Sequence, residues 1–138
     1  MKTSTILSNA LVILAITFLF VSCKKPPGEG GKASIRGTVW AEEWNGNLTI
    51  KNGDYAAYDE DVYIIYGDDV SYSDKTKTNY NGEFEFKYLR KGKYKIYVYS
   101  ESKVYPPVSL AGKVSIVVDV EIKDKKEVKT MDKITIYK

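Results

Sequence analysis

The chain has 138 residues, of which 43% are hydrophobic and 28% charged, and its 12 tyrosines favour β-strands over helices. This composition is typical of a folded domain and argues against a disordered chain. The formal net charge of +3, with both signs interspersed, gives no electrostatic reason to expect a nucleic-acid partner.

The absence of histidine limits the chemistry that this chain can perform. It has no histidine and one cysteine. Ser-His-Asp catalysis, Cys-His catalysis and histidine-ligated zinc sites each need a residue that is missing, and an intrachain disulfide is impossible. We therefore expect a non-enzymatic protein that uses no cofactor and no metal.

The amino-terminal segment has the pattern of a secretory signal. Lys2 precedes an apolar run over residues 10–21, which is too short to span a bilayer comfortably. The run ends before Cys23, and this junction resembles the lipobox of bacterial lipoproteins, although Phe20 stands where the commonest pattern has leucine. The resemblance implies that Cys23 becomes the acylated first residue of the mature protein. Cleavage by an ordinary signal peptidase and an uncleaved anchor remain the alternatives.

Three segments follow from these signals. Residues 1–22 are the predicted lipoprotein signal peptide, and residues 23–32 are the lipidated cysteine with a flexible tether rich in Lys, Pro and Gly. Residues 33–138 form the predicted folded domain.

Alternating apolar and polar residues predict seven strands and no amphipathic helix in this domain. Residues 48–50 form a further possible short strand between two turn clusters. We expect 61–66 to be a central strand and 71–78 to lie near an edge, where Lys75 and Lys77 discourage intermolecular pairing. The seven strands are residues 33–40, 61–66, 71–78, 83–87, 93–99, 113–122 and 133–138.

The most strongly patterned stretch is residues 81–99, which we interpret as a pair of antiparallel strands. Asn81-Gly82 predicts a tight turn that leads into the first of them. Tyr94 follows Gly92, and we expect its hydroxyl to bond to the backbone of the turn between the strands. Residues 100–112 contain Pro106-Pro107 and are long enough to cross from one sheet to the other.

These residues resemble the carboxypeptidase regulatory-like domains, which are similar to prealbumin-like and Cna B-type sandwiches. The resemblance implies an all-β fold, a seven-stranded antiparallel Greek-key β-sandwich of the prealbumin-like type. It implies little about function, because such modules accompany many activities. Transthyretin-like hydrolases of similar fold act through histidine, which this chain lacks. The resemblance depends on Gly37, Val39, residues 78–82, Phe84, Phe86, Leu89, Gly92, Tyr94, Ile96 and Val98.

Aromatic side chains that point away from the core are the candidate binding residues. Outward tyrosine and tryptophan can stack on sugar rings or anchor a protein partner, although cross-strand pairing alone also explains them. The acidic residues around strand 61–66 fit no EF-hand loop, and we favour solvated turns over a calcium site. The candidates are Tyr63, Tyr97 and Tyr99, which face outward from strands, and Trp44, Tyr55 and Tyr58, which lie in the irregular segment 42–58.

Two functions remain open from the sequence. The first is a lipid-anchored cell-envelope protein whose sandwich is a structural or protein-interaction module. The second is a surface lipoprotein that binds glycans through exposed Tyr and Trp. In both, acylated Cys23 holds the protein at a membrane, which we expect to be the outer membrane, with its periplasmic or surface face undecided.

Overall fold

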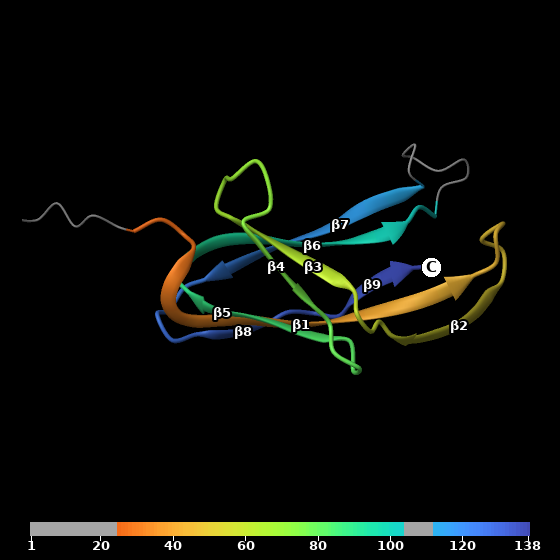
Figure 1. Cartoon of the computed structure of the whole chain (residues 1–138), viewed down its shortest axis with the longest axis horizontal. Coiled ribbons are helices and arrows are strands. Elements are labelled where there is room, and N and C mark those ends of the chain that lie inside the picture. The colour runs from red at the N-terminus through yellow and green to blue at the C-terminus, as the bar shows by residue number, and fades with distance from the viewer. Residues whose placement is uncertain (1–24, 104–111) are drawn as a thin grey trace, which may run out of the picture.

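The computed structural model describes residues 25–103 and 112–138, which form nine strands in two layers (Figure 1). Within these residues the fold is all-β, as predicted, and no helix is present that could cross a membrane. Cys23 and residues 104–111 lie outside the described part of the chain. The strands are β1 (Glu29–Trp44), β2 (Lys51–Ala56), β3 (Asp61–Tyr66), β4 (Asp74–Lys77), β5 (Glu83–Leu89), β6 (Gly92–Glu101), β7 (Lys113–Ile122), β8 (Val128–Thr130) and β9 (Ile134–Tyr137).

One sheet is built around β1, which runs along most of the molecule (Figure 1). Its first half pairs with β5 and β8, and its second half pairs with β2 and β9. The pairing with β8 and β9 is parallel. The prediction of seven strands, all antiparallel, is therefore wrong in both respects: the described residues form nine strands, and this sheet is mixed.

The second sheet has the order β4-β3-β6-β7 and is antiparallel throughout. β3 lies inside this sheet and β4 at its edge, as the sequence predicts. β3 lies where its run of β-branched and aromatic residues predicts it, and β7 and the closing strand β9 lie where their alternation predicts them.

The stretch 81–99 divides between the two sheets. β5 pairs with β1, whereas β6 pairs with β3 and β7, so the two strands are not partners. The predicted pair is wrong because alternation shows which face of a strand is buried and not which strand lies beside it. β6 and β7 are neighbours in one sheet, so the prediction that the chain changes sheets between these two strands is wrong.

Strand ends differ from the sequence prediction at three places. β1 begins at Glu29, inside the segment that we predict to be tether, and extends to Trp44. Residues 48–50 form a turn, with Leu48 at a positive φ of 53°, and the strand lies after them at β2. β4 covers only Asp74–Lys77 of the predicted 71–78.

The core lies between the layers and consists of the inward residues of both sheets. Ile35 and Val39 of β1 face Ile64 of β3 and Ile96 of β6, and all four are fully buried. Each such side chain contributes roughly 1.5–3 kcal/mol of burial free energy. A single contiguous core therefore joins the two sheets without a disulfide.

Gly37 is required by the ring that lies over it. A Cβ built at this position would lie 2.5 Å from Cζ of Phe84, far inside van der Waals contact. Phe84 is opposite Gly37 in the β1–β5 register and is 4% exposed, so its ring cannot swing into solvent without opening the core. The glycine in the first strand is therefore a packing requirement.

Tyr94 joins three parts of the chain through one hydroxyl. The hydroxyl donates to the carbonyl of Arg90 at 2.7 Å and accepts from the amide of Gly28 at 3.0 Å. The ring is 1% exposed, and burial raises the pKa of its hydroxyl, which therefore stays protonated at neutral pH. The predicted bond to the turn backbone is confirmed, and it also fixes the start of β1.

Replacing Gly37 by alanine should lower the free energy of unfolding by roughly 1–3 kcal/mol, because the new methyl group overlaps Phe84. Urea unfolding monitored by circular dichroism measures this loss. Gly53→Ala is the matched control, since a Cβ at Gly53 in β2 meets nothing within 4 Å. Equal stability of the Gly37 and Gly53 variants would contradict this account.

Tyr94→Phe should cost roughly 1–3 kcal/mol, because it leaves the Gly28 amide and the Arg90 carbonyl without their partner. The same unfolding measurement tests it, with Tyr88→Phe as a control at an exposed tyrosine. Faster amide exchange at Gly28 in the Tyr94 variant would locate the loss at the start of β1. An unchanged midpoint would show that the hydroxyl contributes nothing.

Candidate functional site

Three of the six predicted binding residues lie together on the outer face of the β4-β3-β6-β7 sheet. Tyr63 of β3 is opposite Tyr97 of β6, and their rings stack at 4.8 Å between centroids with an interplanar angle of 9°. Tyr99, two residues along β6, meets both rings edge-on at 5.7 Å. Period-2 alternation places these rings on one face, as the sequence predicts.

Tyr72 completes the group, which we call the tyrosine cluster: Tyr63, Tyr72, Tyr97 and Tyr99. Its ring meets Tyr63 at 5.2 Å and 66°. The loop between β3 and β4 brings it there, because Ser73 donates its amide to the Ile64 carbonyl and accepts from the amide of Tyr66 through its hydroxyl. The sequence analysis missed Tyr72, since its position depends on this loop and not on alternation.

The cluster presents two different kinds of ring surface. Tyr63 and Tyr97 cover each other's faces and are half-buried. Tyr99 and Tyr72 are 48% and 52% exposed, so they carry the accessible aromatic surface. The stacked pair therefore supports the two rings that a ligand can reach.

Polar groups border the tyrosine cluster. The Tyr63 hydroxyl donates to Oδ2 of Asp61 at 3.4 Å, and Nζ of Lys75 lies 3.6 Å from the same oxygen and 5.9 Å from the Tyr63 ring centroid. Oδ1 of Asp61 is shielded from water and has no hydrogen-bond partner among the described residues. Both contacts to Oδ2 are long, so the hydrogen-bonding capacity of this carboxylate is incompletely used within the fold.

The hydroxyls of Tyr63 and Tyr97 remain hydrogen-bond donors at neutral pH. Burial raises the pKa of Tyr63, and the Asp61 carboxylate raises it further. Burial also raises the pKa of Tyr97, with Tyr99 adding to the effect. The tyrosine cluster thus offers ring faces and the protonated hydroxyls of Tyr63 and Tyr97, with the Asp61 carboxylate and the Lys75 ammonium group at its border.

Trp44 lies on the other sheet, where the ammonium group of a lysine lies over the face of its ring. Nζ of Lys103 lies 4.5 Å from the Trp44 ring and 3.9 Å from the Tyr137 ring. The Trp44 indole also donates to Glu42 at 3.2 Å. These contacts hold Trp44 in an internal network, so it is separate from the tyrosine cluster.

Tyr55 and Tyr58 also lie away from the cluster. Tyr55 is on β2, opposite Ala41 of β1, in the sheet that does not carry the tyrosine cluster. Tyr58 stacks on Tyr80 at 4.2 Å and 6°, next to the Asp59–Lys77 ion pair. The structure thus divides the six predicted aromatic residues among several surfaces.

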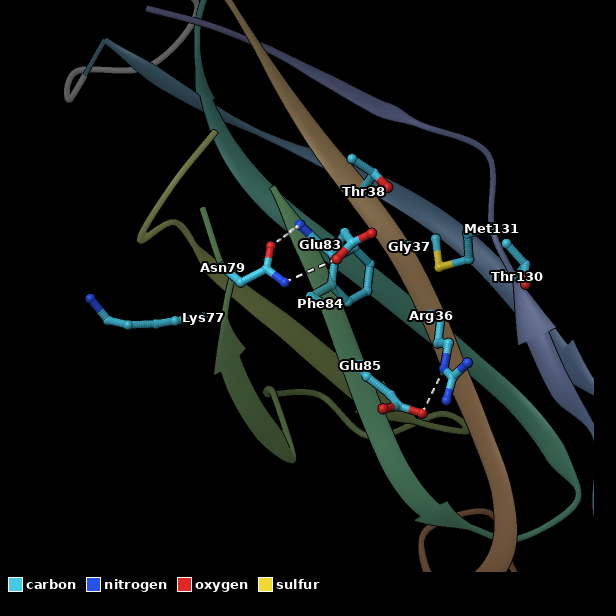
Figure 2. A pocket seen from close by; sticks show the side chains of 10 residues that line it. All are labelled: Arg36, Gly37, Thr38, Lys77, Asn79, Glu83, Phe84, Glu85, Thr130 and Met131. Atoms are coloured by element: carbon cyan, nitrogen blue, oxygen red, sulfur yellow. Dashed lines mark hydrogen bonds and ion pairs between the residues drawn. The ribbon is translucent and has the colours of Figure 1, made fainter. Parts of the chain in front are cut away.

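A polar hollow of about 460 Å³ lies on the β1–β5 sheet (Figure 2). Nε of Arg36 pairs with Glu85 at 2.7 Å, and Nδ2 of Asn79 donates to Glu83 at 3.0 Å, as the dashed lines in Figure 2 show. The side chain of Lys77 points away from these groups. The remaining lining residues are Gly37, Thr38, Phe84, Thr130 and Met131.

The charges of this hollow compensate one another. The hydrogen bond from Arg36 lowers the pKa of Glu85, so the pair stays ionised at neutral pH. Arg36 and Lys77 balance Glu83 and Glu85, and the aromatic ring in the lining, Phe84, is buried. The hollow therefore offers a ligand neither a net charge nor an open ring.

The acidic residues next to β3 lie in ion pairs or turns. Asp54 pairs with Lys51 at 2.6 Å, and Asp59 pairs with Lys77 at 2.8 Å. Across residues 25–103 and 112–138, no three acidic or cysteine side chains come together in a way that could hold a metal ion.

The chain matches no protein-family model and no curated protein. A crystal structure described as a putative carbohydrate-binding protein from Pseudomonas aeruginosa is similar over 80% of this chain and 91% of that one, with a TM-score of 0.47 and 13% identity. (S)-allantoin synthase is similar over 80% of this chain and 43% of its own length, with a TM-score of 0.43 and 10% identity. Neither similarity is close enough to assign a ligand or an activity.

Proposed function

We propose that this chain is a lipid-anchored envelope protein whose β-sandwich is a non-enzymatic glycan-binding module, and that the tyrosine cluster is its binding surface. The observation that carries the proposal is the gathering of four tyrosines, from β3, β6 and the β3–β4 loop, on one sheet face.

The rings at this face suit a sugar better than a flat hydrophobic partner. A pyranose presents C–H groups to an aromatic ring and hydroxyls at its rim. Tyr99 and Tyr72 supply accessible rings in contact with Tyr63, while Asp61 and Lys75 supply an acceptor and a donor beside the Tyr63 ring. This surface thus places aromatic rings directly beside charged groups, which favours glycans over an apolar protein segment.

The two tryptophan surfaces are less suited to this role. The Trp44 ring is in contact with Lys103, and the Trp40 ring has Nζ of Lys133 at 4.9 Å. A ligand would have to displace these ammonium groups before it could stack. At the tyrosine cluster, the exposed halves of Tyr72 and Tyr99 need no such displacement.

The position of the cluster also suits an anchored module. Residues 26–28 lie at the start of β6, where Arg90 donates to the Pro26 carbonyl at 3.1 Å and Gly28 binds Tyr94. Tyr99 is seven residues from Gly92 along β6, a distance of roughly 24 Å in an extended strand. An anchor that precedes Pro26 would therefore leave the cluster accessible.

Alanine at Tyr97 or Tyr99 should weaken glycan binding at least about tenfold, the loss expected when an aromatic anchor worth more than about 1.4 kcal/mol is removed. Residues 24–138 contain every described strand and can be screened on glycan arrays, with affinities then measured by calorimetry. Tyr55→Ala is the matched control, because Tyr55 is 46% exposed on the other sheet.

Three outcomes would count against the glycan proposal. Loss of binding in Tyr55→Ala or Trp44→Ala, with Tyr97→Ala unaffected, would place the site elsewhere. Absence of binding to any glycan would reject the function. A protein partner cross-linked at the tyrosine cluster would instead favour the protein-interaction module, the other function open from the sequence.

Anchoring through Cys23 is tested separately. We expect Cys23→Ser to abolish incorporation of labelled fatty acid and to shift the protein from the membrane to the soluble fraction, because several acyl chains on one residue provide the anchor. Ser22→Ala serves as a control next to the same site. Continued membrane association of the Cys23 variant would point to an uncleaved anchor.

A further inference from the structure

The two edges of the β4-β3-β6-β7 sheet differ in how they are protected. β4 has only four residues and carries Lys75 and Lys77, which discourage pairing with another strand. β7 has ten residues, and its register with β6 runs without a bulge from Lys113 to Ile122. Among the described strands only β6 pairs with β7, so the other side of this long strand is open.

The middle of β7 has no charged residue. The run from Val114 to Val118 contains four branched apolar residues and one serine. Val117 is 51% exposed on the outer face, and Ile116 and Val118 on the inner face are only half-buried. An open, unbulged and apolar strand of this length is a template for pairing with another strand.

The sequence of β7 complements itself when two copies run antiparallel. With Val117 opposite Val117 of a second copy, Ile116 meets Val118 and Val114 meets Val120 on the inner face. On the outer face the same register places Lys113 opposite Glu121 at both ends. Opposite charges directly across a strand pair stabilise it, and like charges destabilise it.

The charges of β6 extend this complementarity. Glu121 lies opposite Lys93, and Lys113 lies opposite Glu101. In the symmetric register, a row across four strands would alternate Lys93 and Glu121 of one copy with Lys113 and Glu101 of the other. A shift of two residues in one direction would place Lys113 opposite Lys123. A shift of two in the other direction would place Lys113 opposite Asp119 but leave Glu121 without a partner in β7, so the register about Val117 is the one that pairs both Lys113 and Glu121.

We propose that two copies of this chain associate through antiparallel pairing of β7 about Val117, with a twofold axis through that residue. The product is one continuous sheet with four strands from each copy. An isologous contact of this kind closes on itself and does not propagate into a fibre.

This dimer would also bring the two tyrosine clusters onto one face. Tyr97 lies opposite Val117 in the β6–β7 register, so only the two central valines would separate the Tyr97 rings of the two copies. This consequence rests on the proposed function and predicts bivalent contact with a linear glycan. The strand pairing itself does not rest on it.

Sedimentation velocity of residues 24–138 tests the association without any glycan. We expect a dimer for the natural sequence and a monomer for Val117→Lys, because the two introduced charges would meet at the axis. Val70→Lys is the matched control, since Val70 is fully exposed in the β3–β4 loop and should leave the dimer intact. A natural chain that stays monomeric up to about 1 mM, or a dimeric Val117→Lys variant, would overturn the proposal.

A mixing experiment tests the register. Lys113→Glu and Glu121→Lys should each raise the dimer dissociation constant at least about tenfold, because each homodimer then holds like charges at both ends. An equimolar mixture should recover dimerisation, since both charge pairs are opposite again in the mixed dimer. If the mixture associates no better than the separate variants, the symmetric register is excluded.

A cysteine at the axis tests the same geometry directly. Residues 24–138 contain no cysteine, so Val117→Cys introduces a single thiol per copy. Directly opposite residues in an antiparallel pair have Cα atoms about 4.5–5.5 Å apart, which a disulfide can bridge. We expect air oxidation to give a covalent dimer for Val117→Cys and not for Val70→Cys, and equal cross-linking of both would contradict the proposed interface.

Discussion

The hydroxyl of Tyr94 is the interaction on which the rest of this fold depends. It bonds to Gly28, just before β1, and to Arg90, in the connection from β5 to β6. β1 is the centre of one sheet, and β6 lies inside the other. One buried hydroxyl, which both donates and accepts a hydrogen bond, therefore joins the start of β1 to the connection between β5 and β6, where the chain passes from one sheet to the other.

Sheet geometry then determines which side chains remain available at the surface. β3 and β6 bury Ile64 and Ile96, so the residues between the buried positions must face outward. Tyr63 and Tyr97 stabilise each other by stacking, and the two flanking rings keep accessible surface. On the other sheet, the ammonium groups of Lys103 and Lys133 lie over the rings of Trp44 and Trp40. The tyrosine cluster therefore keeps ring surface that a ligand can contact, whereas the two tryptophan rings are in contact with lysines.

One row of residues connects the tyrosine cluster to the open edge of the sheet. Lys75, Tyr63, Tyr97 and Val117 lie opposite one another across β4, β3, β6 and β7. The row begins at a lysine on the protected edge and ends at an exposed valine on the unprotected one. The proposed ligand contact in its middle and the proposed self-association at its end would thus both depend on this one row, and a change in register would disturb both.

The sequence by itself determined the all-β class, the positions of β3 and β7, the outward direction of Tyr63 and Tyr97, and the bond from Tyr94 to the turn at Arg90. These features depend on alternation, on runs of β-branched and aromatic residues and on local turn chemistry, all of which neighbouring residues specify. Only the tertiary structure decided that β5 and β6 belong to different sheets, that β8 and β9 run parallel to β1, and that Tyr72 joins the cluster. Those features depend on which strands pair across long separations, and side-chain period carries no information about the partner.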